Sequence, residues 1–126
     1  MKKIIFTKNA PLPIGAYNQA VLSGNTLYTS GQIAINPKTG ELTDGSIKEE
    51  TQLVMENLKA VLKEAGMTFE NVIKSTIFIS DMNNFTEINK VYAFYFDENT
   101  APARETVEVA RLPKSVNIEI SMIASF

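Results

Sequence analysis

Residues 46–80 read SIKEETQLVMENLKAVLKEAGMTFENVIKSTIFIS, which predicts a capped helix followed by a buried strand. Ser46 and Glu49 match a capping box, in which each side chain meets a backbone N–H that the helix leaves unpaired. Gly66 ends a stripe of apolar residues at helical spacing, which comprises Val54, Leu58, Val61, Leu62 and Ala65. Residues 72–80 are rich in isoleucine and bounded by polar residues, which favours a strand.

Three strands are expected before this helix. Residues 3–6 are typical of a short edge strand, and Gly24-Asn25 is a strong two-residue hairpin signal between strands at 19–23 and 26–33. A turn is expected at residues 36–40, NPKTG, because proline and glycine supply its geometry.

A second helix and two more strands are expected after residue 80. The helix begins near Asn84, again with a glutamate three residues on, and its apolar stripe comprises Phe85, Ile88, Tyr92 and Tyr95. Residues 103–110 and 116–125 are predicted as strands on either side of Pro113. The order βββαβαββ predicts a single α+β domain over residues 1–126, a sandwich with two helices packed on one face of a mixed six-stranded sheet.

The other face of that sheet is expected to meet another copy of the chain. In the last strand the alternate positions 117–125 are semi-polar rather than charged, while one face is formed by Ile118, Ile120, Met122, Ala124 and Phe126. A semi-polar sheet face suits a subunit interface better than open water. We therefore predict a closed homo-oligomer.

The composition excludes several kinds of site. The 126 residues include neither cysteine nor histidine, which excludes disulfides, thiol chemistry, a Ser-His-Asp triad and histidine metal ligands. A balance of 12 basic against 14 acidic residues, with scattered lysines, argues against a nucleic-acid partner. No stretch approaches 18 apolar residues, so no membrane-spanning segment is expected. We expect a cytoplasmic protein that requires no metal or organic cofactor.

Arg104 is one of two candidates for chemistry. It is one of only two arginines, and the planar guanidinium binds a carboxylate through two parallel hydrogen bonds, which lysine cannot imitate. It follows the small residues 101–103, from which a long cation can reach into a cleft. The alternative is an ordinary surface or interface salt bridge.

Glu119 is the other candidate, because it interrupts an apolar strand and by alternation points away from Ile118 and Ile120. It is either a solvated strand glutamate or, if it faces a cleft, a base that takes a proton from water. Two weaker signals are Tyr17, a hydroxyl in a glycine-marked loop that can simply pack, and Gly31, a strand glycine. A strand glycine marks a bulge or a close approach by a ligand or another backbone.

Taken in order, eight segments resemble the Rid/YjgF family. The resemblance runs from about residue 3 to residue 126 and rests on GAYNQAV (15–21), YTSGQI (28–33), NPKTG (36–40), ENLKAVL (56–62), INKVY (88–92), PAR (102–104), VEVARLPK (107–114) and IEI (118–120).

The resemblance implies a chorismate-mutase-like fold and a homotrimer with three clefts between neighbouring subunits. It also implies a deaminase that hydrolyses the reactive imines 2-iminobutanoate and 2-iminopropanoate to 2-keto acids and ammonia. Arg104 matches the family's substrate-carboxylate arginine, Glu119 the acid associated with the attacking water, and Tyr17 a cleft residue that we expect to assist catalysis. The other cleft positions are Ser30, Gly31 and Asn89, and the backbone at Thr106 matches a stretch of the family that contacts ligand or water.

Several features leave alternatives open. The sequence departs from the family pattern at Ala16 and Asn18, which flank the tyrosine, and at Glu105, which should point opposite to Arg104. An extra negative charge there could weaken binding of an anionic substrate. A regulatory or binding role in the same family is the alternative function, either as a translation inhibitor with an RNase-type role or as a 2-keto acid sensor. Chorismate mutase activity would share the fold, but no dicarboxylate-binding set of arginines is present.

Overall fold

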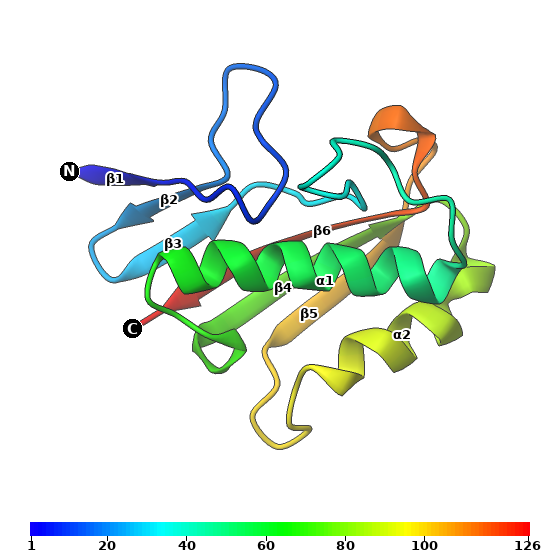
Figure 1. Cartoon of the computed structure of the whole chain (residues 1–126). Coiled ribbons are helices and arrows are strands. Elements are labelled where there is room, and N and C mark those ends of the chain that lie inside the picture. Colours follow the sequence, from blue (N-terminus) through cyan, green and yellow to red (C-terminus); the bar gives the residue numbers. More distant parts are fainter.

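The computed structural model describes residues 1–126 and confirms the α+β prediction, with two helices on one face of a six-stranded sheet (Figure 1). The strands are β1 (Lys2–Ile5), β2 (Ala20–Ser23), β3 (Thr26–Thr29), β4 (Val72–Ile79), β5 (Ala103–Glu108) and β6 (Ile118–Ser125). The helices are α1 (Ile47–Glu64) and α2 (Phe85–Phe94), and single turns of 3₁₀ helix lie at Phe69–Asn71, Met82–Asn84 and Pro113–Ser115.

The sheet is mixed and has the strand order β1-β2-β3-β6-β4-β5. Only β4 and β5 run parallel, and every other neighbouring pair is antiparallel. The predicted hairpin at Gly24-Asn25 joins β2 to β3 with Ser23 opposite Thr26. Strand β6 therefore lies in the middle of the sheet, and β5, which carries Arg104, lies at an edge.

The first helix has the predicted boundaries. The hydroxyl of Ser46 accepts a hydrogen bond from the backbone N–H of Glu49, and the Glu49 carboxylate accepts one from the backbone N–H of Ser46. Gly66, with φ +78°, follows its last turn. The second helix lacks such a cap: Asn84 makes no side-chain hydrogen bond, and the Asp81 side chain caps the preceding 3₁₀ turn instead.

The predicted strand at 26–33 ends early, at Thr29, because the pairing with β6 contains a bulge. Tyr28 pairs with Ile123 and Gln32 with Ile120, so one extra residue lies on the β3 side of this segment. The backbone N–H of Met122 donates to the Thr29 hydroxyl, 2.9 Å away, instead of to a main-chain carbonyl. The bulge places Ser30 and Gly31 outside the regular ladder.

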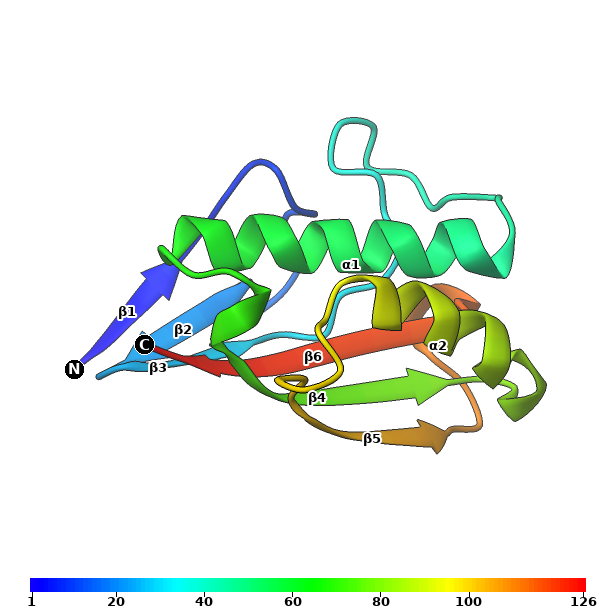
Figure 2. The same ribbon diagram turned by 90° about the horizontal axis from the view of Figure 1, so that it is seen from below.

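Helices cover only one of the two faces of the sheet. Both helices lie on one side, and no element covers the other (Figure 2). The buried face of β6 is formed by Ile118, Ile120, Met122 and Ala124, as predicted. Phe126 was expected on the same face but is exposed, because strand β6 ends at Ser125. The open face carries exposed apolar side chains, among them Tyr28 and Val107.

Candidate functional site

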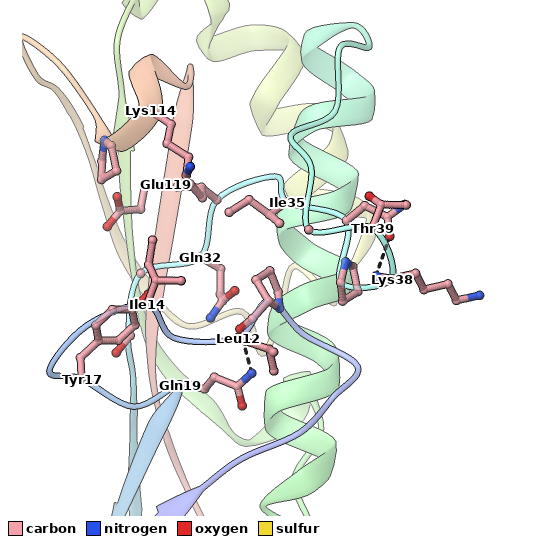
Figure 3. A pocket seen from close by; sticks show the side chains of 18 residues that line it. Leu12, Ile14, Tyr17, Gln19, Gln32, Ile35, Lys38, Thr39, Lys114 and Glu119 are labelled. Carbon is pink, nitrogen blue, oxygen red and sulfur yellow. Dashed lines mark hydrogen bonds between the residues drawn. The ribbon is translucent and has the colours of Figure 1, made fainter.

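A cavity of about 860 Å³ lies at the end of β3 (Figure 3). Its walls are the loop between β1 and β2, the segment that follows β3, and the turn that leads into β6. Four of the predicted site residues line it, namely Tyr17, Ser30, Gly31 and Glu119. The structure therefore brings together residues that are up to 102 positions apart in the sequence.

Glu119 lies on the open face of β6, as alternation predicted. Its neighbours Ile118 and Ile120 are fully buried, whereas Glu119 is partly exposed and pairs with Phe78 of β4. The Glu119 carboxylate forms no hydrogen bond or salt bridge within the chain. Burial raises the pKa of the Glu119 carboxyl above its ordinary value. A partly buried carboxylate without a partner, at a cavity wall, is suited to accept a proton from a bound water.

Tyr17 and Ser30 border the same cavity from two loops. Tyr17 follows a tight turn in which its backbone N–H donates to the carbonyl of Gly15, 2.9 Å away, and its hydroxyl forms no hydrogen bond in the chain. The Ser30 hydroxyl donates to the carbonyl of Asn18, and its backbone N–H donates to the carbonyl of Gln19. Ser30 thus connects the bulge to the loop that carries Tyr17.

Gln19 is a residue of this site that sequence reasoning missed. It lines the cavity, yet it is buried, and its side chain holds the loop between β1 and β2. Its Oε1 accepts from the backbone N–H of Thr7 at 2.8 Å, and its Nε2 donates to the carbonyls of Thr7 and Pro11, both at 2.9 Å. The position at the start of a strand gave no signal of this role, because the partners lie eight to twelve residues away.

Lys114 is the second residue that was missed. It lies in the turn before β6 with φ +55° and ψ +20°, an unusual backbone conformation for a lysine. The side chain points into the cavity mouth and forms no salt bridge in the chain (Figure 3). Its place within the motif RLPK was the available signal.

Arg104 lies elsewhere, between β5 and α2. It pairs with Ser75 of β4, so its side chain is on the helix-covered face of the sheet. The guanidinium Nη1 donates to Asn89 Oδ1 at 2.7 Å, and the guanidinium carbon lies 5.0 Å from the ring centre of Tyr92 and 5.7 Å from that of Phe85. Two aromatic rings and an amide therefore orient the cation while leaving donors free.

Glu105 points away from Arg104, as alternation predicted. It pairs with Thr76 on the open face, where its carboxylate lies 3.1 Å from Lys74 Nζ and accepts a hydrogen bond from the Thr76 hydroxyl at 3.0 Å. Hydrogen bonds from Lys74 and Thr76 lower the pKa of this carboxyl. The additional acid does not pair with the arginine in the chain.

Thr106 lies two residues beyond Arg104 on the same face of β5. Its hydroxyl oxygen is buried and has no hydrogen-bond partner in the chain. A buried hydroxyl is nearly always hydrogen-bonded in folded proteins, so the unpaired Thr106 hydroxyl is an exception in this chain.

The predicted site residues thus form two groups. Tyr17, Ser30, Gly31 and Glu119 line the cavity, whereas Arg104, Asn89 and Thr106 surround the junction of β5 and α2. Strand register places Glu119 and Arg104 on opposite faces of the sheet. No group of three or more acidic, histidine or cysteine side chains is placed to hold a metal ion, and no helix is long and apolar enough to cross a membrane.

The model of the family described as Endoribonuclease L-PSP matches residues 7–126. The chain belongs to the Rid/YjgF family. A RutC family protein of Pyrococcus horikoshii is 56% identical over 124 residues, which cover 98% of each chain. The rat 2-iminobutanoate/2-iminopropanoate deaminase is 46% identical over 124 residues, covering 98% of this chain and 90% of that one.

A solved structure of another Rid/YjgF relative carries a small molecule. The crystal structure of Escherichia coli TdcF with bound serine matches with a TM-score of 0.92 and 46% identity, covering 98% of each chain. The chorismate-mutase-like fold expected from the resemblance is therefore confirmed for this Rid/YjgF chain.

Proposed function

We propose that this chain is a reactive-intermediate deaminase that hydrolyses 2-imino acids, such as 2-iminobutanoate and 2-iminopropanoate, to 2-keto acids and ammonia. The observation that carries this proposal is the Glu119 carboxylate, which is partly buried, unpaired and at the wall of a cavity. Two relatives support it: the rat protein is named for this activity, and TdcF has been crystallised with a small amino acid.

The reaction asks little of the protein beyond positioning. A protonated imine is a strong electrophile, so water needs only to be held in reacting geometry beside a base. The water oxygen bonds to the imine carbon while Glu119 takes a water proton and the C=N bond becomes single. Glu119 then returns this proton to nitrogen. Ammonia leaves as the C=O bond forms, and the hydroxyl proton passes to Glu119 and on to solvent.

Arg104 is proposed to hold the substrate carboxylate. The guanidinium uses one nitrogen for Asn89 and has further donors for two parallel hydrogen bonds to a carboxylate. The backbone at Thr106, two residues beyond Arg104 on β5, is proposed to contact ligand or water nearby. Tyr17 and Ser30 are proposed to line the other side of the bound molecule, with the free Tyr17 hydroxyl closing the pocket or assisting proton transfer.

A second copy of the chain is proposed to complete the site. Arg104 and Glu119 point to opposite faces of one sheet, so a single small substrate cannot touch both within one chain. A homotrimer with clefts between neighbouring subunits brings the arginine of one copy to the glutamate of the next. The exposed apolar residues of the open face, including Tyr28 and Val107, are suited to such an interface.

The test is a coupled assay in which threonine dehydratase generates 2-iminobutanoate in the presence of semicarbazide. The wild-type protein should suppress semicarbazone formation by hydrolysing the imine first. Arg104→Ala and Glu119→Gln should each abolish this suppression while retaining the wild-type circular dichroism spectrum. No suppression by the wild-type protein, with imines from several amino acids, would overturn the proposal.

This assay, together with a direct measurement of ligand binding, separates turnover from ligand binding alone. A 2-keto acid sensor requires the arginine but no base, so Glu119→Gln would leave its ligand affinity unchanged and there would be no turnover to lose.

An RNase-type role, suggested by the description of the family model, predicts RNA binding that weakens steeply with salt. The net charge of −2 gives no support to that second function.

A further inference from the structure

The side chain of Glu119 lies directly over the bare Cα of Gly31. A Cβ atom built on Gly31 would lie 2.9 Å from Glu119 Cγ and 2.7 Å from Glu119 Cδ, and still closer to Oε2. Real Cβ atoms essentially never approach heavy atoms within 3.0 Å. Position 31 therefore cannot carry any side chain while the Glu119 side chain keeps its present position. The sequence predicted either a bulge at Gly31 or a close approach by a ligand or another backbone. The structure has the bulge and, in addition, a close approach by a side chain of the same chain.

The glycine is not required by the backbone at this position. Glycines at 24, 40 and 66 have positive φ angles, where a Cβ is strained, but Gly31 is not among them. At Gly24 and Gly40, by contrast, a Cβ would meet nothing within 4 Å. What distinguishes Gly31 is thus the space above it and not its conformation.

No hydrogen bond or ion pair within the chain fixes the Glu119 carboxyl. It accepts no hydrogen bond and pairs with no cation in the chain, so its position depends on the shape of the surface on which it lies. That surface is the bulge, where the extra residue brings the bare Cα under the glutamate.

We infer that Gly31 is a positioning residue for Glu119, because the missing side chain provides the space that holds the carboxyl at the cavity wall. This inference rests on the proposed function for its kinetic consequence, but its structural content is independent of it. A side chain at position 31 turns the carboxyl out toward solvent. There it is better hydrated and is misaligned with a water bound in the cavity.

Gly31→Ala is the direct test. Because the atoms in the way are the end of a flexible side chain, the variant should fold, and kcat should fall about 100-fold, as expected when a reacting group is displaced by about 1 Å. KM should change little, since Arg104 remains. The acid limb of the pH–rate profile should shift to lower pH, because the displaced carboxyl loses its burial. Unchanged kcat and an unchanged profile would overturn the inference.

Gly45→Ala is a matched control. A Cβ at Gly45 would also meet a glutamate side chain, 2.9 Å from Glu49 Cδ and 2.9 Å from Glu49 Oε2, but this pair belongs to the helix cap outside the cavity. It should leave kcat and the pH–rate profile at wild-type values. An equal loss in both variants would show that crowding of any glutamate, and not the displacement of Glu119, lowers the rate.

Two measurements without substrate separate this inference from the proposed function. An NMR titration of ¹³C-labelled glutamate carboxyls, with the Glu119 signal assigned through Glu119→Gln, should show a lower pKa for Glu119 in Gly31→Ala than in wild type. In the wild-type background, Gly31→Ala should lower Tm because the new Cβ crowds the Glu119 side chain. In a Glu119→Ala background the crowded atoms are gone, so the same substitution should leave Tm unchanged. An unchanged Glu119 pKa, or the same loss of Tm in both backgrounds, would overturn the inference even if the enzyme is active.

Discussion

The carboxylate of Glu50, in the first turn of α1, accepts two hydrogen bonds from Asn117, one from the backbone N–H at 2.9 Å and one from Nδ2 at 2.8 Å. Glu50 is almost fully buried, and Asn117 lies two residues before Glu119. This pair therefore connects the start of the long helix to the start of the strand that carries the proposed base.

Glu50→Ala should destabilise the protein by about 2–3 kcal/mol, because it leaves the two Asn117 donors without their charged acceptor. The measurement is urea unfolding followed by circular dichroism, with the exposed Glu49→Ala, which removes part of the helix cap, as a comparison. That cap variant should lose only about 1 kcal/mol. Equal losses would mean that Asn117 finds another acceptor or water.

Glu119→Gln should separate activity from stability. Turnover should fall by about 10²–10⁴-fold, the usual contribution of a positioned proton acceptor. Stability should not fall at neutral pH, because the partly buried charge has no partner and burial raises its pKa. Loss of activity together with marked unfolding would contradict this prediction.

The pH dependence of that comparison has a definite sign. A raised pKa in the folded protein means that ionisation of Glu119 disfavours folding. The stability that protonated Glu119 contributes is therefore fully present at low pH and is lost as pH rises through the folded pKa. The difference in Tm between Glu119→Gln and wild type should therefore be largest above the raised pKa and should shrink toward pH 4. A constant difference across this range would show that Glu119 ionises as it does in the unfolded chain.

Arg104→Lys tests the geometry of the carboxylate clamp. Lysine keeps the charge but cannot donate two parallel hydrogen bonds or stack in the same way between Phe85 and Tyr92. KM for the imine should rise about 10–100-fold with a smaller change in kcat. Arg111→Lys changes the chain's other arginine, which donates only to the Ser115 hydroxyl, and should leave KM near the wild-type value.

Mixing two inactive variants tests whether the site spans two copies. Arg104→Ala and Glu119→Gln chains, unfolded and refolded together, should regain roughly a quarter of wild-type activity, because some clefts then combine an intact arginine with an intact glutamate. Each variant refolded alone should stay inactive. If the mixture is also inactive although hybrid oligomers form, the two residues do not act on one substrate across an interface.

Local patterns predicted most of the secondary structure. The hairpin at Gly24-Asn25 and the cap at Ser46 are determined by neighbouring residues, so the sequence around them is sufficient. The early end of β3 was predicted only in part, because Gly31 indicated a bulge as one of two alternatives. The bulge arises from pairing with β6, in which Ile120 pairs with Gln32 although the two residues are 88 positions apart in the sequence.

The site was predicted residue by residue more readily than as an arrangement. Alternation along the strands correctly gave the outward direction of Glu119 and the opposite directions of Arg104 and Glu105. It could not show that Asn89 binds the guanidinium, since that contact joins a helix to an edge strand. Nor could it show the role of Gln19, whose partners are main-chain atoms and leave no pattern in the sequence.

The hydrogen bonds of Gln19 have a consequence for ligand selectivity. They hold the main chain between β1 and β2 from within, while the side chains of Leu12 and Ile14 project from it, largely exposed, at the cavity wall. The backbone of that wall is thus preorganised, and a ligand need not order it on binding. Leu12 and Ile14 are therefore natural positions for directed evolution toward bulkier or more polar ligands, because they can vary without loosening the scaffold beneath them.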